Sequence, residues 1–299
     1  MNRYSGHGTS SGELAKLNVE KNIYDTMKND ELKKLLDGLD MAHAERVHSC
    51  LRFDLMNESL PILIGREKVE PYWRLCDQFI KGKDASVVPL LNAECLKIVE
   101  AIHEDIKVGT IKESFLVEAM DRMQKLAGKP VRTFSATLQK ELTTSCQEAL
   151  QTHDISTTFH AIAPILGRIV EQVEDGHLEE ATGNLLAMFR CLADIQSEHA
   201  AWFEHMLSSG EMTDLEFLTD AAVEVYCHLR QRDELSDDWT LDMDAQLLLL
   251  NQQTGFFGDW SMSIYADMLY AAEYQSEDYS DLENCEMWME LKECMQEVA

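Results

Sequence analysis

The chain has 299 residues, of which 45% are hydrophobic and only 5 are prolines, so it can bury a sizeable core. This composition excludes a chain that is disordered throughout. Its charge is unusual, because 54 acidic residues oppose 26 basic ones and give a formal net charge of −28. Residues 151–299 hold 31 of the acids and 5 of the bases, a net charge of −26. Direct binding of this half to nucleic acid or to an anionic membrane is therefore disfavoured.

The eight cysteines predict a reducing compartment. The closest two are nine residues apart, and no Cys-x-x-Cys motif occurs. Zinc sites and disulfide frameworks usually show tighter spacing, whereas cysteines in apolar helical runs behave as small buried side chains. The polar start of the sequence has no apolar targeting segment, and the longest purely apolar run, residues 247–250, is too short to span a membrane. We therefore expect a cytoplasmic protein.

The predicted elements begin with a disordered tail over residues 1–12, which is rich in glycine and serine. Residues 13–90 carry a balanced charge and three of the five prolines. They predict a small N-terminal helical subdomain or a cap on the helices after residue 90. Within it we expect helices near 40–56 and 71–81, joined by a loop-rich stretch over 57–70.

From residue 91 onward, apolar residues recur at steps of three and four, which places each set on one face of a helix. Short polar or glycine-containing breaks separate these sets, so successive helices are expected to be antiparallel neighbours. The predicted pairs are 91–107 with 111–127, 132–151 with 155–174, 178–194 with 197–208, 213–233 with 241–254, and 259–275 with 283–297.

One helix pair per 40 residues or so is the size range of stacked helical repeats. We therefore predict an all-α protein whose residues 91–274 form stacked antiparallel helix pairs, as an irregular helical repeat or an irregular helical bundle. The stack is strongly acidic from residue 151. Residues 275–299 are predicted to form an acidic linker and a C-terminal amphipathic helix.

One segment of this stack carries a family resemblance. Residues 176–181 read Gly-His-Leu-Glu-Glu-Ala and are followed by Leu185 and Met188. This segment resembles the helix-to-helix turn of a tetratricopeptide repeat, in which such a run opens the second helix and its small Ala packs against the first. The Trp, Tyr and Pro positions of that family are not matched. The resemblance covers residues near 176–188 and implies a scaffold for protein–protein contact, arranged as a TPR- or HEAT-like stack.

The catalytic alternative is a di-metal carboxylate enzyme. Sites of that kind use Glu-x-x-His on helices, because the three-residue spacing aims a carboxylate and an imidazole at one point. The pairs Glu45/His48 and Glu100/His103 fit this spacing on predicted helices. The competing interpretation is two histidines at the edge of an apolar face, each with a glutamate one turn away. Phosphate-binding loops, nucleophile elbows and His-Glu-x-x-His motifs do not occur, and no cofactor is predicted.

The acidic half is the strongest functional signal, because a solvated helical surface normally mixes both signs of charge. We predict a non-catalytic interaction protein whose acidic C-terminal half binds a basic partner protein. It would act as an inhibitor or a DNA mimic of a nucleic-acid-binding enzyme, or as an adaptor or chaperone for a basic partner. A merely acidic soluble surface is the alternative. The residues predicted to contribute to the contact surface are Glu216, Asp220, Glu224, Glu234, Asp237, Asp238, Asp242 and Asp244.

The C-terminal helix is predicted to be amphipathic, with Trp288, Leu291 and Met295 on its apolar face. A helix that caps the end of a stack should have this form. The alternative is a detachable helix that enters the groove of a partner, as Trp, Leu and Met anchors do elsewhere.

Overall fold

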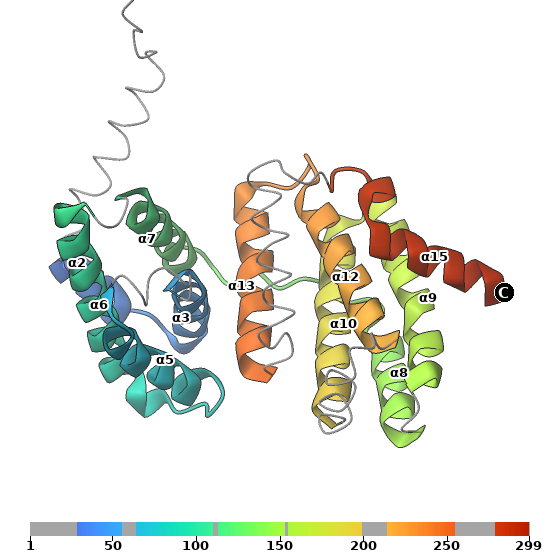
Figure 1. Ribbon diagram of the computed structural model, residues 1–299, viewed down its shortest axis with the longest axis horizontal. Helices are drawn as coiled ribbons and strands as arrows, with labels where there is room; N and C mark the ends of the chain where they lie inside the picture. Colours follow the sequence, from blue (N-terminus) through green and yellow to red (C-terminus); the bar gives the residue numbers. More distant parts are fainter. Residues whose placement is uncertain are drawn as a thin grey trace, which may run out of the picture. The chain divides into compact units, whose positions relative to one another are not determined.

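The computed structural model describes residues 29–55, 64–109, 113–152, 155–198, 214–254 and 279–298. These residues contain eleven α-helices and two short 3-10 helices, with no strand among them (Figure 1). The prediction of an all-α fold of antiparallel helices is confirmed. Within the described ranges, every helix is too short or too polar to span a lipid bilayer.

The chain divides into two compact units, Met1–Pro130 and Val131–Ala299, which we call unit 1 and unit 2. The boundary that the sequence placed near residue 90 does not coincide with this division, because the helix that follows residue 87 packs within unit 1. The predicted tail over 1–12 and the predicted helices over 197–208 and 259–275 lie entirely or almost entirely outside the described residues.

Unit 1 is a set of antiparallel helices in its described part. Its elements are α2 (Asn29–Asp37), α3 (Met41–Leu55), α5 (Arg66–Ile80), η1 (Ala85–Val87), α6 (Val88–Val108) and α7 (Glu113–Gly128). Helix α5 packs on α3 and α6, α2 packs on α6, and α3 packs on α7. Helices α6 and α7 match the predicted pair over 91–107 and 111–127, whereas α5 begins five residues earlier than expected.

The core of unit 1 follows from helical spacing. Tyr72 and Phe79 are seven residues apart on α5, Ile98 and Ile102 are four apart on α6, and all four are fully buried. These steps place each pair on one helix face. Helix α6 ends at Gly109, whose φ of 80° is the left-handed conformation that glycine adopts without steric cost.

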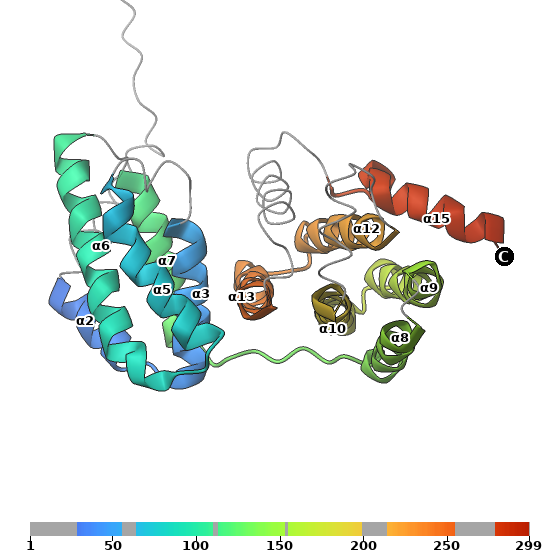
Figure 2. The ribbon, with the colours of Figure 1, turned by 60° about the horizontal axis from the view of Figure 1, so that its bottom comes forward.

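Unit 2 contains the acidic half of the chain. Its elements are α8 (Gln139–Thr152), α9 (Ile155–Glu174), α10 (Leu178–Glu198), α12 (Asp214–Arg230), α13 (Asp237–Thr254), η2 (Leu282–Asn284) and α15 (Glu286–Val298). Helix α8 packs on α9 and α10, α12 packs on α9 and α10, and α13 packs on α10. Figure 2 looks nearly along several of these helices and shows α15 running across them, against α12 and α9.

A non-helical segment, residues 131–138, opens unit 2. The sequence predicted a helix from 132, but α8 begins only at Gln139. The segment packs so tightly on α10 that a Cβ atom at Gly183 would lie 2.1 Å from the carbonyl oxygen of Ser135. Asn184 accepts a hydrogen bond from the backbone N–H of Leu138 at 2.8 Å and donates one to Oγ1 of Thr137 at 3.0 Å. These tertiary contacts replace the helical hydrogen bonds that the local sequence would allow.

Candidate functional site

Three of the eight acidic residues that the sequence placed on a contact surface are buried. Asp220, Glu224 and Asp242 have at most 7% of their surface exposed, so the expectation that they face solvent is wrong. Periodicity alone could not reveal this, because a helix with neighbours on several sides buries more than its apolar stripe. The other five residues are exposed or half-buried: Glu216, Glu234, Asp237, Asp238 and Asp244.

Glu224 is buried because its carboxylate caps the last helix. The backbone N–H of Trp288, in the first turn of α15, donates a hydrogen bond to it at 3.0 Å. Burial raises the pKa of Glu224 to about 7, against the opposing effect of the backbone hydrogen bonds from Trp288 and Met287. One turn earlier, burial and the charge of Glu216 raise the pKa of Asp220 to about 7. Sequence reasoning missed this cap, since it joins residues 64 positions apart.

His228 continues this row of titratable residues on α12, four positions after Glu224. It is 3% exposed, and its Nδ1–H donates to the backbone carbonyl of Tyr279 at 2.7 Å. Burial lowers the pKa of His228, which favours the neutral ring. Glu224 and His228 both lie on α12. They hold the first turn of α15 and Tyr279, which precedes that helix, against α12.

The three predicted anchors of the C-terminal helix lie against unit 2. Trp288 and Leu291 are buried and Met295 is half-buried. Trp288 and Met295 both approach Gly167 of α9, where a Cβ atom would lie 4.0 and 3.8 Å from their nearest atoms. Helix α15 therefore packs against unit 2 in this structure, while its binding to a partner stays a prediction.

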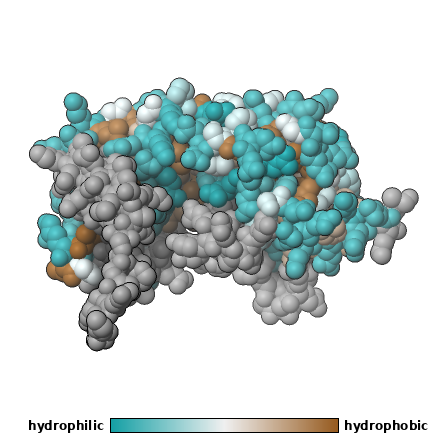
Figure 3. Space-filling view, turned by 90° about the horizontal axis from the view of Figure 1, so that it is seen from above, coloured by the Kyte–Doolittle hydropathy of each residue, from teal (hydrophilic) through white to brown (hydrophobic). Residues whose placement is uncertain are grey.

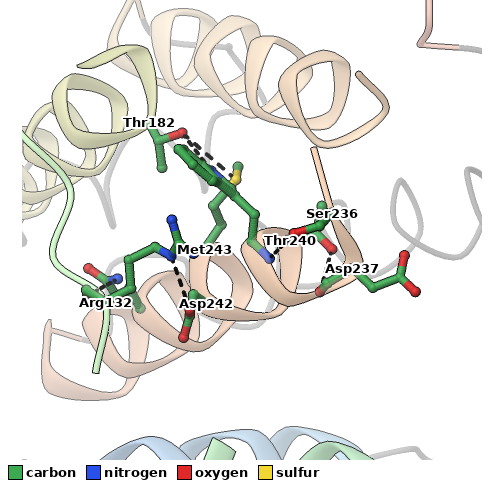
Figure 4. A network of polar contacts seen from close by, with 9 residues as sticks. Arg132, Thr182, Ser236, Asp237, Thr240, Asp242 and Met243 are labelled. Carbon is green, nitrogen blue, oxygen red and sulfur yellow. Dashed lines mark hydrogen bonds and ion pairs between the residues drawn. The ribbon is translucent and has the colours of Figure 1, made fainter. Parts of the chain in front are cut away.

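Asp242 is held in the network of polar contacts drawn in Figure 4. Its carboxylate pairs with Nε of Arg132 at 3.4 Å, and the guanidinium of Arg132 lies 4.5 Å from the centre of the Trp239 ring. The indole N–H of Trp239 donates to Oγ1 of Thr182 at 3.4 Å. These contacts tie the 131–138 segment to α13 and α10.

Asp244 is also committed to contacts within unit 2. It accepts a hydrogen bond from the hydroxyl of Tyr226 at 2.8 Å and one from Nε of Arg230 at 3.2 Å. Asp242 and Asp244 thus help to hold the fold, and neither is a freely solvated carboxylate.

A different set of acids gathers at one end of unit 2. Four lie at the junction of α9 and α10, in the connecting turn or the helix ends beside it, and four lie in the α12–α13 loop or the first turn of α13; all are exposed or half-buried. The two connections lie together, because residues of both line a single cavity of about 510 Å³. We call this set the acidic end: Glu174, Asp175, Glu179, Glu180, Asp233, Glu234, Asp237 and Asp238.

The cavity of the acidic end combines carboxylates with apolar surface. Glu179, Glu180 and Glu234 line it together with Leu178 and several further residues. The remaining lining residues are Ser135, Gly176, His177, Leu235 and Trp239. Such a mixture suits a cationic group on an aliphatic stem, since the carboxylates attract the charge and the apolar side chains contact the stem.

Sequence reasoning found three of the eight residues of the acidic end. Glu234, Asp237 and Asp238 were predicted as contact residues, but the acids of the α9–α10 turn were not. Those acids belong to the tetratricopeptide-like segment or directly precede it. Gly176, with φ 78°, ends α9, and Ala181 is fully buried in α10. Only the packing of α10 beside α12 and α13 brings the two groups together.

The two Glu-x-x-His pairs do not meet in a metal site. Both ring nitrogens of His48 have protein partners at 3.0 Å, the hydroxyl of Tyr72 and the side-chain oxygen of Asn92, and burial lowers the pKa of His48 to about 4. Glu45 pairs with Lys83 at 3.1 Å. Glu100 and His103 lie on α6, two to three turns beyond Asn92. Among the described residues, no three His, Cys, Asp or Glu side chains are grouped so as to hold a metal ion.

Known proteins provide no guide to the function of this site. The chain matches no family model, no curated protein and no solved structure. The tetratricopeptide resemblance accordingly rests on residues 176–188 alone.

Proposed function

We propose that unit 2 binds a basic partner protein through the acidic end. The observation that carries the proposal is a cavity lined by Glu179 and Glu180 of α10 and by Glu234 of the α12–α13 loop, with five further exposed or half-buried acids on the same two connections. The charge of the whole unit supports it, because residues 131–299 contain 33 acidic and 7 basic residues, a net charge of −26. Such a field speeds the association of a cationic partner and makes it sensitive to salt.

The few basic residues of unit 2 do not neutralise this charge. Four of the seven are already in ion pairs with carboxylates of the same unit, at N–O distances between 2.6 and 3.4 Å. These four are Arg132, Arg168, Arg230 and Arg232. A partner that supplies further cations would relieve the remaining repulsion, which a folded protein otherwise tolerates at a cost in stability.

The surface around the acidic end favours polar contacts. Figure 3 views the protein from the end where the α12–α13 loop lies, and the described surface there is mostly hydrophilic with small hydrophobic areas. We therefore expect an interface dominated by Arg and Lys side chains of the partner, with the cavity receiving one of them. The contact of Arg132 with Trp239 shows that this indole already accepts a guanidinium within the fold.

The partner class that fits best is a protein whose own ligand is nucleic acid. Duplex DNA carries one charge per roughly 1.7 Å of its axis, so a charge of −26 equals that of roughly 44 Å of duplex. A protein with this charge can occupy a groove built for the phosphate backbone. We propose that it acts there as a non-catalytic inhibitor or DNA mimic.

The test is affinity capture with the full chain from a native lysate at low salt, eluted by a salt gradient and identified by mass spectrometry. The matched variants are Glu179→Lys/Glu180→Lys at the acidic end and Glu148→Lys/Asp194→Lys as the control. Asp194 lies 16 residues along α10 from the first residue of that helix, roughly 24 Å away, and Glu148 lies on α8 two residues after Cys146, whose thiol contacts Cys191 of α10. Both pairs therefore change the net charge equally but at different places.

We expect one basic nucleic-acid-binding protein to elute at moderate salt, to be lost with the acidic-end variant and to be retained by the control. Equal capture by both variants would contradict the location, and a diffuse set of abundant basic proteins would contradict specific binding. Because lysines in the first turn of α10 oppose the helix dipole, Glu179→Gln/Glu180→Gln provides a milder variant, with circular dichroism as the check on folding.

A further inference from the structure

Two thiols meet where α8 packs against α10. The thiol of Cys146 lies 3.7 Å from the backbone carbonyl oxygen of Cys191, and the thiol of Cys191 lies 3.7 Å from that of Leu142, one turn before Cys146. The interaction between the two thiols is the largest influence on the pKa of each. Both residues are buried, with 7% and 5% of their surface exposed.

The other buried cysteines have different surroundings. The thiol of Cys76 interacts with the hydroxyl of Tyr72, and the thiol of Cys285 donates a hydrogen bond to the backbone carbonyl oxygen of Glu224 at 3.9 Å. Burial raises the pKa of Cys76, Cys95 and Cys285 to about 12. Cys146 is the exception, because the hydrogen bond from Cys191 lowers the pKa of its thiol. Cys146 therefore loses its proton and forms a thiolate more readily than these three cysteines.

We propose that Cys146 and Cys191 form a reversible disulfide that cross-links α8 to α10 when the protein meets a small peroxide oxidant. This inference is independent of the proposed partner binding. Disulfides that form in reducing compartments are usually transient and respond to redox conditions. The cross-link would close a loop that contains the whole of α9.

The chemistry needs hydrogen peroxide as the oxidant and proceeds in two steps. The Cys146 thiolate attacks one peroxide oxygen, the O–O bond breaks, and hydroxide leaves and takes up a proton to become water, so that Cys146 becomes a sulfenic acid. The sulfur of Cys191 then attacks the sulfur of Cys146, the S–O bond breaks, and the departing hydroxide takes the proton of Cys191. Two thiols thus lose two electrons, and one peroxide becomes two waters.

The test exposes the folded full chain to hydrogen peroxide, alkylates the remaining thiols under denaturing conditions and maps the peptides by mass spectrometry. We expect a cross-linked peptide pair containing Cys146 and Cys191 that dithiothreitol separates, with Cys76, Cys95, Cys227 and Cys285 alkylated. The melting temperature of unit 2 should rise by about 5 °C or more, because the cross-link restricts the unfolded chain.

Cys146→Ser and Cys191→Ser should each lose both the cross-link and the rise in melting temperature, while Cys76→Ser keeps them. Cys146→Ala serves where the serine variant fails to fold. The proposal is overturned if both thiols can still be alkylated after the folded protein has been treated with peroxide, or if they are oxidised to sulfinic acids. Equal cross-linking of Cys227 with Cys285 would also overturn it, since that would show oxidation of unfolded chains.

Discussion

At the scale of single residues, two buried carboxyl groups of unit 2 and one buried histidine of unit 1 respond to pH in opposite directions. In unit 2, Glu224 and Asp220 hold their protons more tightly in the folded state than in the unfolded state. In unit 1, His48 holds its proton less tightly when folded. Acidification favours whichever state, folded or unfolded, binds protons more tightly. Through these groups it should therefore stabilise the folded state of unit 2 and destabilise that of unit 1.

Glu224→Gln tests the response of unit 2. The pKa of Glu224 is raised from 4.5 to about 7, so its contribution to stability is complete below pH 4.5 and is lost as the pH rises through 7. Glutamine keeps the oxygen that accepts from Trp288 but does not titrate. At pH 8 we expect the variant to be more stable than the natural chain by roughly 1–3 kcal/mol, with little difference at pH 4.5. Hydrogen exchange of α12 and α15 peptides measures this, and equal pH slopes for the two proteins would refute it.

His48→Gln tests the response of unit 1. The pKa of His48 is lowered from 6.5 to about 4, so its contribution is complete above pH 6.5 and is lost as the pH falls to 4. We expect unit 1 of the natural chain to lose roughly 3 kcal/mol over this range and the variant to lose much less. Hydrogen exchange of α3 and α5 peptides between pH 6.5 and 4 follows the loss. An unchanged slope in the variant would assign the pH response to other groups.

At the scale of elements, the 131–138 segment and α15 are both fixed by contacts with distant helices. The backbone of the segment passes so close to α10 that the helix residue at that point can carry no side chain, and Gly183 is that residue. Helix α15 needs an acceptor for its first backbone N–H groups, and Glu224 of α12 supplies it. In both cases one residue of a neighbouring helix determines where the element lies.

Gly183→Ala should displace the 131–138 segment, because its new Cβ would lie 2.1 Å from the carbonyl oxygen of Ser135. We expect a loss of about 1–3 kcal/mol in the free energy of unfolding of unit 2, since a backbone contact of this kind has no side chain that could move away. Gly167→Ala is the matched control, because it also lies within a helix and its Cβ would meet neighbours only at 3.8 Å and beyond. It should be neutral or stabilising by up to about 1 kcal/mol. Denaturant unfolding measures both effects, and equal values for the two variants would show that the segment is not packed tightly at Gly183.

At the scale of the whole molecule, the two units differ most in charge. Residues 1–130 contain 21 acidic and 19 basic residues, a net charge of −2, against −26 for residues 131–299. Self-repulsion of like charges destabilises a compact state, and salt screens it. The division at Pro130 thus separates a nearly neutral unit from a highly charged one.

Raising sodium chloride from about 10 mM to 500 mM shortens the Debye length from roughly 30 Å to below 10 Å. We expect the thermal transition of unit 2 to move upward by several degrees, while that of unit 1 stays nearly constant. Differential scanning calorimetry of the full chain, with hydrogen exchange to assign each transition, measures both shifts. Equal shifts would mean that the acids of unit 2 are neutralised within the fold.

Much of the helical architecture was predictable from the sequence. The spacing of apolar residues predicted α6, α7, α9, α10, α12 and α13 close to their observed limits, because a 3.6-residue period is a local property of the chain. The failure at 132–138 has a physical cause in Gly183 and Asn184, whose contacts with this segment are invisible in local periodicity. The division at 130 in place of 90 has a similar cause, because α6 finds its apolar partners on α2 and α5.

Composition and local spacing were enough to establish the all-α class, the order of the helices and the excess of acid in the second half. They could not establish which acids are exposed, which are buried, or which connections share the acidic end. Glu224 and Asp237 look alike in the sequence, yet one is a buried helix cap and the other lies on the surface. Packing makes this difference, because the burial and the electrostatic surroundings of a carboxylate depend on neighbours from distant parts of the chain, and these come together only when the helices assemble.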